Sequence, residues 1–216
     1  MAKRCKGLNS KCFLFTYLII VGFLLVLWMN NLPLIHEDTR VIPNDLQNYI
    51  SSPPRPIPTF SLDTSSKLAL TNSWLEDKWT FITFTYGHCL PHCQSLLTTM
   101  KGVKASIASN NIQFLVVGID SDHESTQQLD DFLVAQKLDA TAATGEVTAI
   151  ETLAHTFIAL FLQTDYNDGS YIIEQQYHLF LVDPKGRLYA TFKPPYNSGS
   201  IKQLFFKLRH FYAKSE

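Results

Sequence analysis

The sequence has no excess of charge of either sign: 18 Lys and Arg residues face 19 Asp and Glu residues, which leaves a formal net charge of -1. This balance excludes a large basic surface of the kind that binds nucleic acid. Internal repeats and low-complexity tracts are also missing from the part predicted to fold, residues 59–216. With 216 residues and 46% hydrophobic content, the chain is long and apolar enough for one domain with its own core.

Charge is missing altogether from one run near the N-terminus, Phe13 to Met29. A run of this length is close to the minimum that spans a bilayer as a helix, so we predict a transmembrane signal-anchor at 13–29. Because basic flanks stay in the cytoplasm, we predict a cytoplasmic tail at 1–12 and an exported C-terminal part. No small-x-small cleavage site follows the run, so the anchor should remain uncleaved. The simplest location is a bacterial inner membrane, crossed once, with the C-terminal domain in the periplasm. The basic flank consists of Lys3, Arg4, Lys6 and Lys11.

Cysteine is scarce, and export divides the four cysteines into two pairs. Cys5 and Cys12 lie at or before the predicted cytoplasmic edge, where reducing conditions favour free thiols. Cys89 and Cys93 lie in the exported part, within YGHCLPHCQ, and a His directly precedes each of them. In an oxidising compartment, two nearby thiols form a disulfide unless something keeps them reduced. Thiol chemistry is therefore expected at Cys89 and Cys93.

The segment between the anchor and the folded part is predicted to be a Pro-rich tether, residues 30–58. Four prolines in SSPPRPIP favour a stiff, extended conformation there. The folded domain then covers 59–216, and FSLDTSSKLALTN at its start is typical of a short extra hairpin.

A strand–helix–strand unit surrounds the cysteines. Trp79–Tyr86 is rich in aromatic and β-branched residues and predicts a strand buried on both faces. Pro91 suits a first helical residue, and Gly102 suits the end of that helix. Ile112–Ile119 predicts a second buried strand. A βαβ unit of this length implies a parallel pair.

The remaining pattern completes a thioredoxin-like order. Ser121 to Glu124 matches a capping box and predicts a helix start. A second helix is expected to follow Gly145 and to reach Phe161. YHLFLVDPKGRLYATF then predicts two antiparallel strands around a DPKG turn, and an amphipathic C-terminal helix closes the chain. The predicted fold class is α/β: a thioredoxin-like fold with an added N-terminal hairpin, preceded by one transmembrane helix.

The predicted fold places Cys89 just past the carboxyl end of a central strand and Cys93 in the first turn of the next helix. Helix N–H groups favour a thiolate there, and two thiolates select Cu(I) or Zn(II). His88 and His92 have the same spacing and are candidate nitrogen donors. Two other interpretations remain open at this point. One is a dithiol oxidoreductase, although the usual signature of that class is the shorter C-x-x-C. The other is a structural disulfide.

Three segments of this domain resemble the Sco/SenC family, membrane-tethered copper proteins that assist assembly of cytochrome c oxidase. The segments are DKWTFITFTYGHC, GIDSDHES and LFLVDPKGRL. The resemblance implies that Cys89 and Cys93 bind one copper ion. The family's third ligand is a histidine, and the matching position here holds Gln175. His178 is the nearest replacement along the strand, with His88 or His92 as substitutes. A further departure is Leu90, which stands where the family has a proline.

The function implied by this resemblance is that of an exported, membrane-anchored copper chaperone acting through the Cys89/Cys93 dithiol. Its partner would be a cytochrome c oxidase subunit or another copper or thiol protein at the outer face of the membrane. Two alternatives stay open. The first is a metal-independent thiol-disulfide reductase of partner cysteines, and the second is a docking or assembly factor without chemistry of its own.

Overall fold

The computed structural model describes residues 10–30, 41–107 and 109–215, which fall into two units, Met1–Thr39 and Arg40–Glu216. In the first unit, α1 is a helix over Ser10–Asn30. Cys12 lies in α1, whereas Cys5 and most of the predicted cytoplasmic tail lie outside the described residues. Among the described residues, no helix is long and apolar enough to cross a membrane.

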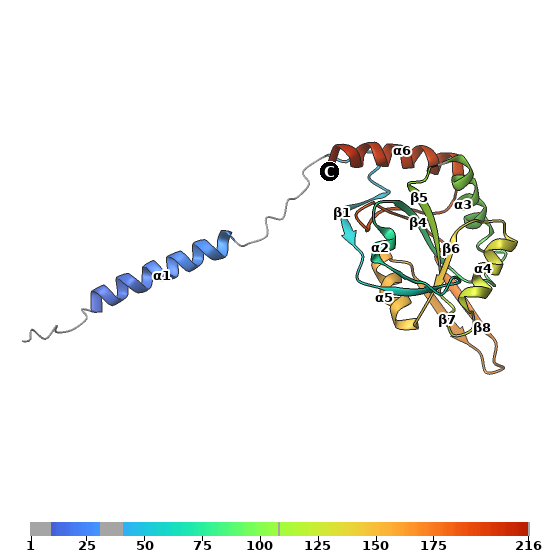
Figure 1. The fold of residues 1–216 in the computed structure, drawn as a ribbon, viewed down its shortest axis with the longest axis horizontal. Coiled ribbons are helices and arrows are strands. Elements are labelled where there is room, and N and C mark those ends of the chain that lie inside the picture. The colour runs from blue at the N-terminus through green and yellow to red at the C-terminus, as the bar shows by residue number, and fades with distance from the viewer. Residues whose placement is uncertain (1–9, 31–40, 108, 216) are drawn as a thin grey trace, which may run out of the picture. The chain divides into compact units, whose positions relative to one another are not determined.

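The second unit is built on one mixed sheet of eight strands in the order β1-β10-β9-β4-β5-β6-β2-β3. Figure 1 labels β1, β4, β5 and β6 of this sheet. The three central strands β4, β5 and β6 run parallel, which confirms the predicted βαβ unit. Antiparallel strands extend the sheet on both sides, including the predicted β9–β10 hairpin and the predicted N-terminal β2–β3 hairpin. The strands are β1 Ile50–Pro56, β2 Ser61–Thr64, β3 Ala69–Thr71, β4 Trp79–Thr85, β5 Ile112–Gly118, β6 Thr141–Thr144, β9 Leu179–Val182 and β10 Arg187–Phe192.

Helices cover both faces of this sheet, as the alternation of β4 side chains shows. Phe81 contacts Phe205 of α6, with ring centroids 5.4 Å apart. Phe84, three positions along the strand and therefore on the other face, contacts Phe157 of α5, also at 5.4 Å. All seven residues of β4 are buried, so the cysteine loop leaves from the centre of the core. The helices of this unit are α2 Asn72–Leu75, α3 Gln94–Ser106, α4 Thr126–Ala135, α5 Val147–Phe157 and α6 Ser198–Ser215.

The predicted tether is wrong over its last part, because Ile50–Pro56 forms β1 and pairs with the edge strand β10. Its prolines suit this place, since an edge strand needs ladder hydrogen bonds on one side only. The register shifts between Ile50 and Arg55, where the strand is irregular. Leu46, just before β1, is 2% exposed and belongs to the core. The folded part therefore begins before residue 59.

Two local predictions were wrong in position, the capping box and the end of the helix that follows Gly145. The capping box belongs to Ser125 and Gln128, which start α4, and not to Ser121 and Glu124. Helix α5 ends at Phe157, where Ile158 adopts a left-handed conformation with φ 57°. Phe161 instead opens β7 (Phe161–Asp165), which pairs with β8 (Tyr171–Gln175) in a separate two-stranded sheet that the sequence pattern did not predict.

Candidate functional site

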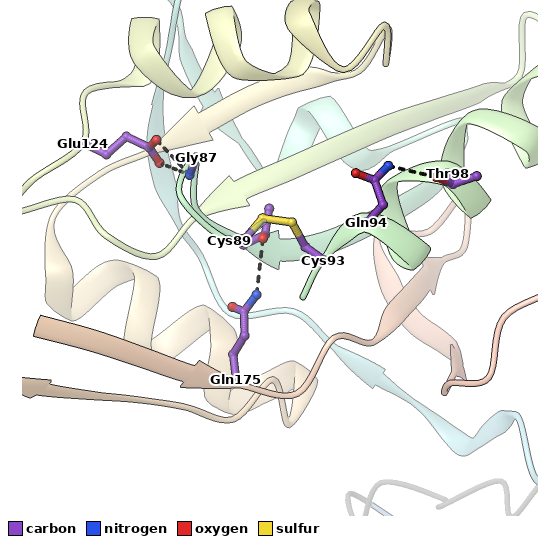
Figure 2. Close-up of a disulfide and its surroundings, with 8 residues drawn as sticks. Gly87, Cys89, Cys93, Gln94, Thr98, Glu124 and Gln175 are labelled. Atoms are coloured by element: carbon purple, nitrogen blue, oxygen red, sulfur yellow. Dashed lines mark hydrogen bonds between the residues drawn. A yellow bond between two sulfur atoms is a disulfide. The ribbon is translucent and has the colours of Figure 1, made fainter. Parts of the chain in front are cut away.

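Cys89 and Cys93 form a disulfide at the carboxyl end of β4, with an S–S distance of 1.89 Å and a Cα–Cα distance of 5.5 Å (Figure 2). The predicted helical start at Pro91 is wrong, because α3 begins at Gln94 and Cys93 is its N-cap residue. Residues 90–93 form a turn, closed by a hydrogen bond from Cys93 N–H to the Cys89 carbonyl at 3.2 Å. The turn draws the two side chains closer than a regular helix would. The helix start beside Cys93 favours a thiolate after reduction.

Both cysteines are 0% exposed, whereas the residues around them face solvent. Leu90 is 39% exposed, and His88, Pro91 and His92 are exposed as well. The two histidines therefore flank the disulfide on the open side of the loop. A partner that approaches the disulfide meets this loop before it meets sulfur.

Gln175, the last residue of β8, points toward the cysteine loop (Figure 2). Its amide Nε2 donates to Thr85 Oγ1 at the end of β4, at 3.2 Å. Its Oε1 is buried and has no hydrogen-bond partner among the described residues. The β7–β8 hairpin thus brings a polar amide to the strand end that carries the dithiol, and the short period-2 pattern of YIIEQ gave only a weak signal for it.

His178 lies elsewhere. It lines a cavity shared with β1 and β10, and neither cysteine lines that cavity. Burial, followed by the positive charge of Lys193, lowers the pKa of His178. His178 is three positions after Gln175, and the two side chains lie in different surroundings. The structure brings Cys89 and Cys93 together and does not bring His178 to them.

Glu124 supports the cysteine loop from the side of β5. Its two carboxylate oxygens accept the Gly87 N–H at 2.8 and 3.0 Å (Figure 2). Burial raises the pKa of this carboxyl, and the Gly87 N–H acts in the opposite direction. A Cβ at Gly87 would lie 2.0 Å from Glu124 Oε1, so a larger residue here would have to displace the carboxylate. Glu124, predicted as a helix cap, instead holds the residue two places before Cys89.

A second polar group joins the end of β5 to the β7–β8 hairpin. Asp120, 2% exposed, accepts from Tyr171 O–H at 2.6 Å and lies 2.7 Å from His123 Nδ1. The His123 and Tyr171 rings stack with centroids 4.2 Å apart. Burial and the bond to Asp120 raise the pKa of Tyr171 to about 12, and Asp120 raises the pKa of His123. The sequence alone does not indicate this role for His123, because Tyr171 is distant along the chain.

In the part of the chain that the structure describes, no group of three or more His, Cys, Asp or Glu side chains is arranged to hold a metal ion. The disulfide itself occupies the two sulfurs that would serve as ligands. After reduction they form a buried dithiol, and thiolates are the donors that soft metals such as Cu(I) prefer.

These features define a thioredoxin-like protein whose cysteine pair, separated by three residues, ends a central strand. The SCO1/SenC family model matches residues 50–210. The chain belongs to the SCO1/SenC family, which confirms the resemblance seen in the sequence, and the match includes β1.

Relatives and solved structures agree on the fold. "Protein SCO1 homolog 1, mitochondrial" of Arabidopsis thaliana is 21% identical over 129 residues, 58% of this chain and 39% of that protein. This chain therefore matches less than half the length of that relative. The crystal structure of Arabidopsis thaliana ScoI with copper bound has a TM-score of 0.63 and 18% identity, covering 72% of this chain and 99% of that one. BsSco, described as a member of the Sco family of cytochrome c oxidase assembly proteins with a disulfide switch, has a TM-score of 0.56 and 17% identity, covering 70% and 92%.

Proposed function

We propose that this protein is an exported, membrane-anchored copper-binding protein that acts in the assembly of cytochrome c oxidase through Cys89 and Cys93. The observation that carries the proposal is the cysteine pair, joined at 1.89 Å at the end of β4, in a chain of the SCO1/SenC family. Similarity to a ScoI structure with copper bound supports the metal. Similarity to BsSco, of a family of oxidase assembly proteins, supports the pathway. The partner is then an oxidase subunit or another copper or thiol protein.

The cysteine pair suits Cu(I) as a cargo once it is reduced. Two sulfurs in one short turn, with Cα atoms 5.5 Å apart, can share one ion without a large movement of the backbone. His88 and His92 flank the pair on the exposed loop and are better placed than His178, which lines another cavity. We therefore propose that the two thiolates form the copper site, with one of the flanking histidines as a supplementary donor.

The test is an anaerobic Cu(I) titration of the reduced full-length protein in detergent, against a competing chelator of known affinity. We expect one tightly bound ion in a Cys5→Ser/Cys12→Ser background, in which Cys89 and Cys93 are the remaining cysteines. Adding Cys89→Ser or Cys93→Ser should abolish tight binding, since one thiolate remains. Reduced wild-type protein that binds no Cu(I) would rule out the copper function.

A thiol-disulfide reductase is the second candidate, and the observed disulfide together with Gln175 beside it favours it. The balanced step is an exchange: the Cys89 and Cys93 thiols give two electrons and two protons to a partner disulfide. The partner leaves with two thiols, and Cys89–Cys93 becomes the disulfide. This reaction should persist in the presence of copper chelators. If a chelator stops reduction of a model disulfide substrate, or if exchange stays at background, the reductase function is wrong.

Anchoring rests on the sequence, where a charge-free run follows four basic residues. We propose that this run holds the chain in a bacterial inner membrane, with the second unit in the periplasm. That location fits the disulfide, because oxidising compartments let such bonds persist.

A further inference from the structure

A cavity of about 400 Å3 is lined by four separate parts of the chain. They are β1 with the residues before it, β10 with the residue after it, the end of α5, and the segment between β8 and β9 that carries His178. Cavities of roughly 300–1,000 Å3 are typical of small-molecule sites. His178 lines this cavity, and Cys89 and Cys93 do not. The cavity is therefore distinct from the dithiol site.

The charged residues that line the cavity are all basic. Arg55 of β1 and Lys193 after β10 line it, and none of its described lining residues is an Asp or a Glu. Neither Arg55 nor Lys193 forms an ion pair with another described residue. Two cations that share a concave surface without a carboxylate raise the local positive potential and attract anions.

Neutral hydrogen-bond donors also line the cavity, beside apolar side chains such as Phe157 and Leu188. Ser51, Ser52 and Thr191 contribute hydroxyl groups, and Asn48 contributes an amide. His178 is half-buried between them, and burial and Lys193 lower its pKa. The effect of Lys193 on this imidazole means that the two groups share one electrostatic environment. An uncharged imidazole keeps one N–H to donate.

We propose that this cavity binds a phosphate group, carried either by a soluble phosphomonoester or by an anionic lipid head group. The two cations match the charge of a phosphomonoester, about -1.5 to -2 at neutral pH. The Arg55 guanidinium has the planar fork that suits two phosphate oxygens, and the hydroxyl groups serve those that remain. The proposal is independent of copper binding and of thiol exchange.

Because Ser51, Ser52 and Arg55 all come from β1, a bound phosphate would connect this edge strand to the residues at the end of β10. Binding should therefore slow hydrogen exchange of the β1 amides, which belong to an irregular strand at the sheet edge. This readout does not depend on activity or on the state of the cysteines.

The experiment titrates the full-length protein in detergent with inorganic phosphate and with glycerol 3-phosphate, at constant ionic strength set by chloride. We expect saturable binding by calorimetry and slower exchange in β1. Arg55→Gln and Lys193→Gln should each weaken binding about tenfold or more, the usual size of a lost hydrogen bond to a charged group. Lys193→Arg should retain binding. Lys78→Gln, which removes an exposed cation outside the cavity, is the charge-matched control.

A second arm distinguishes the source of the phosphate. The full chain is placed in phosphatidylcholine nanodiscs with and without phosphatidylglycerol. Slower β1 exchange that requires phosphatidylglycerol and disappears in Arg55→Gln assigns a lipid head group, whereas an effect of the soluble phosphates alone assigns a soluble ligand. The proposal is overturned if neither form binds, or if Lys78→Gln weakens binding as much as the two cavity variants. Unchanged melting temperatures of the unliganded variants verify that they fold.

Discussion

His123 links the pH of the surroundings to the contact between β5 and the β7–β8 hairpin. Its bond to Asp120 raises its pKa above the ordinary value of 6.5. A group whose pKa is higher in the folded protein stabilises the fold fully below the unfolded value, and this contribution is lost as the pH rises through the folded value. Protein stability should therefore fall between about pH 6 and the raised pKa of His123.

The measurement is the urea-unfolding free energy of the full-length protein at pH 6 and pH 8. His123→Asn should flatten this part of the pH profile, because the titrating group is gone. His155→Asn, an exposed histidine of α5, is the matched control and should keep the wild-type slope. An unchanged slope in His123→Asn would assign the pH dependence to other groups.

Gln175 is the residue whose replacement should change the proposed copper site most. It points toward the cysteine loop, where the family resemblance places a histidine (Figure 2). Gln175→His offers the reduced dithiol an imidazole nitrogen in place of an amide, and imidazole is the better ligand for copper. We expect Cu(I) affinity to rise at least about tenfold, the lower end of what changes around a metal site achieve.

Competition titration with a Cu(I) chelator measures this change. Gln176→His, at the next residue, which is exposed and lies just beyond the end of β8, should leave the affinity unchanged. Equal gains from both variants would mean that any added surface histidine helps, and that the position of Gln175 is not special.

At the scale of the elements, two side-chain hydrogen bonds join the β7–β8 hairpin to the strand ends of the sheet, Gln175 to Thr85 and Tyr171 to Asp120. The bond from Tyr171 to Asp120 is the shorter, at 2.6 Å. Tyr171→Phe keeps the ring that stacks on His123 and removes only the hydroxyl. We expect about 1.5 kcal/mol of lost stability, the lower range for a hydrogen bond to a charged group, with faster amide exchange in β8. Tyr166→Phe, at the exposed tip of the same hairpin, should change neither quantity. Equal exchange in β8 of wild type and Tyr171→Phe would show that other contacts hold the hairpin.

Elements with strong local patterns could be predicted from the sequence, and those that depend on distant partners could not. The buried strand β4 and the β9–β10 hairpin carry dense apolar runs or a turn signal, and both were confirmed. Strand β1 is mostly Ser and Pro, and only its pairing with β10 makes it a strand. The capping pattern at Ser121 was misleading because Glu124 finds its hydrogen-bond partner at Gly87, 37 residues earlier.

The candidate site shows the same division. The cysteine pair and its place at a strand end followed from spacing and from the adjacent buried strand. Its surroundings did not, because Gln175 and Tyr171 arrive on a hairpin that lies far along the chain. The cavity that His178 lines could not be predicted either, because β1 forms one of its walls and that segment had been predicted as a tether.

At the scale of the whole molecule, the proposed orientation can be tested directly. Alkaline phosphatase fused after Glu216 should be active in bacterial cells, since the enzyme folds only where disulfides form. The fusion should resist carbonate extraction from membranes, and deletion of 13–29 should release it from them or prevent its export. An inactive fusion that fractionates with the cytoplasm would contradict the orientation.

Because Cys89 and Cys93 are completely buried, the rate at which a small thiol reduces their disulfide reports how often the loop around them opens. A small thiol in solution reaches sulfur only in molecules whose loop over residues 88–92 has opened. When reclosing is fast, the observed reduction rate is the rate for an exposed disulfide multiplied by the fraction of open molecules. A partner that displaces the loop on docking would remove this factor. The ratio of partner-driven to free-thiol reduction would then measure how strongly the closed loop protects the bond from other reductants.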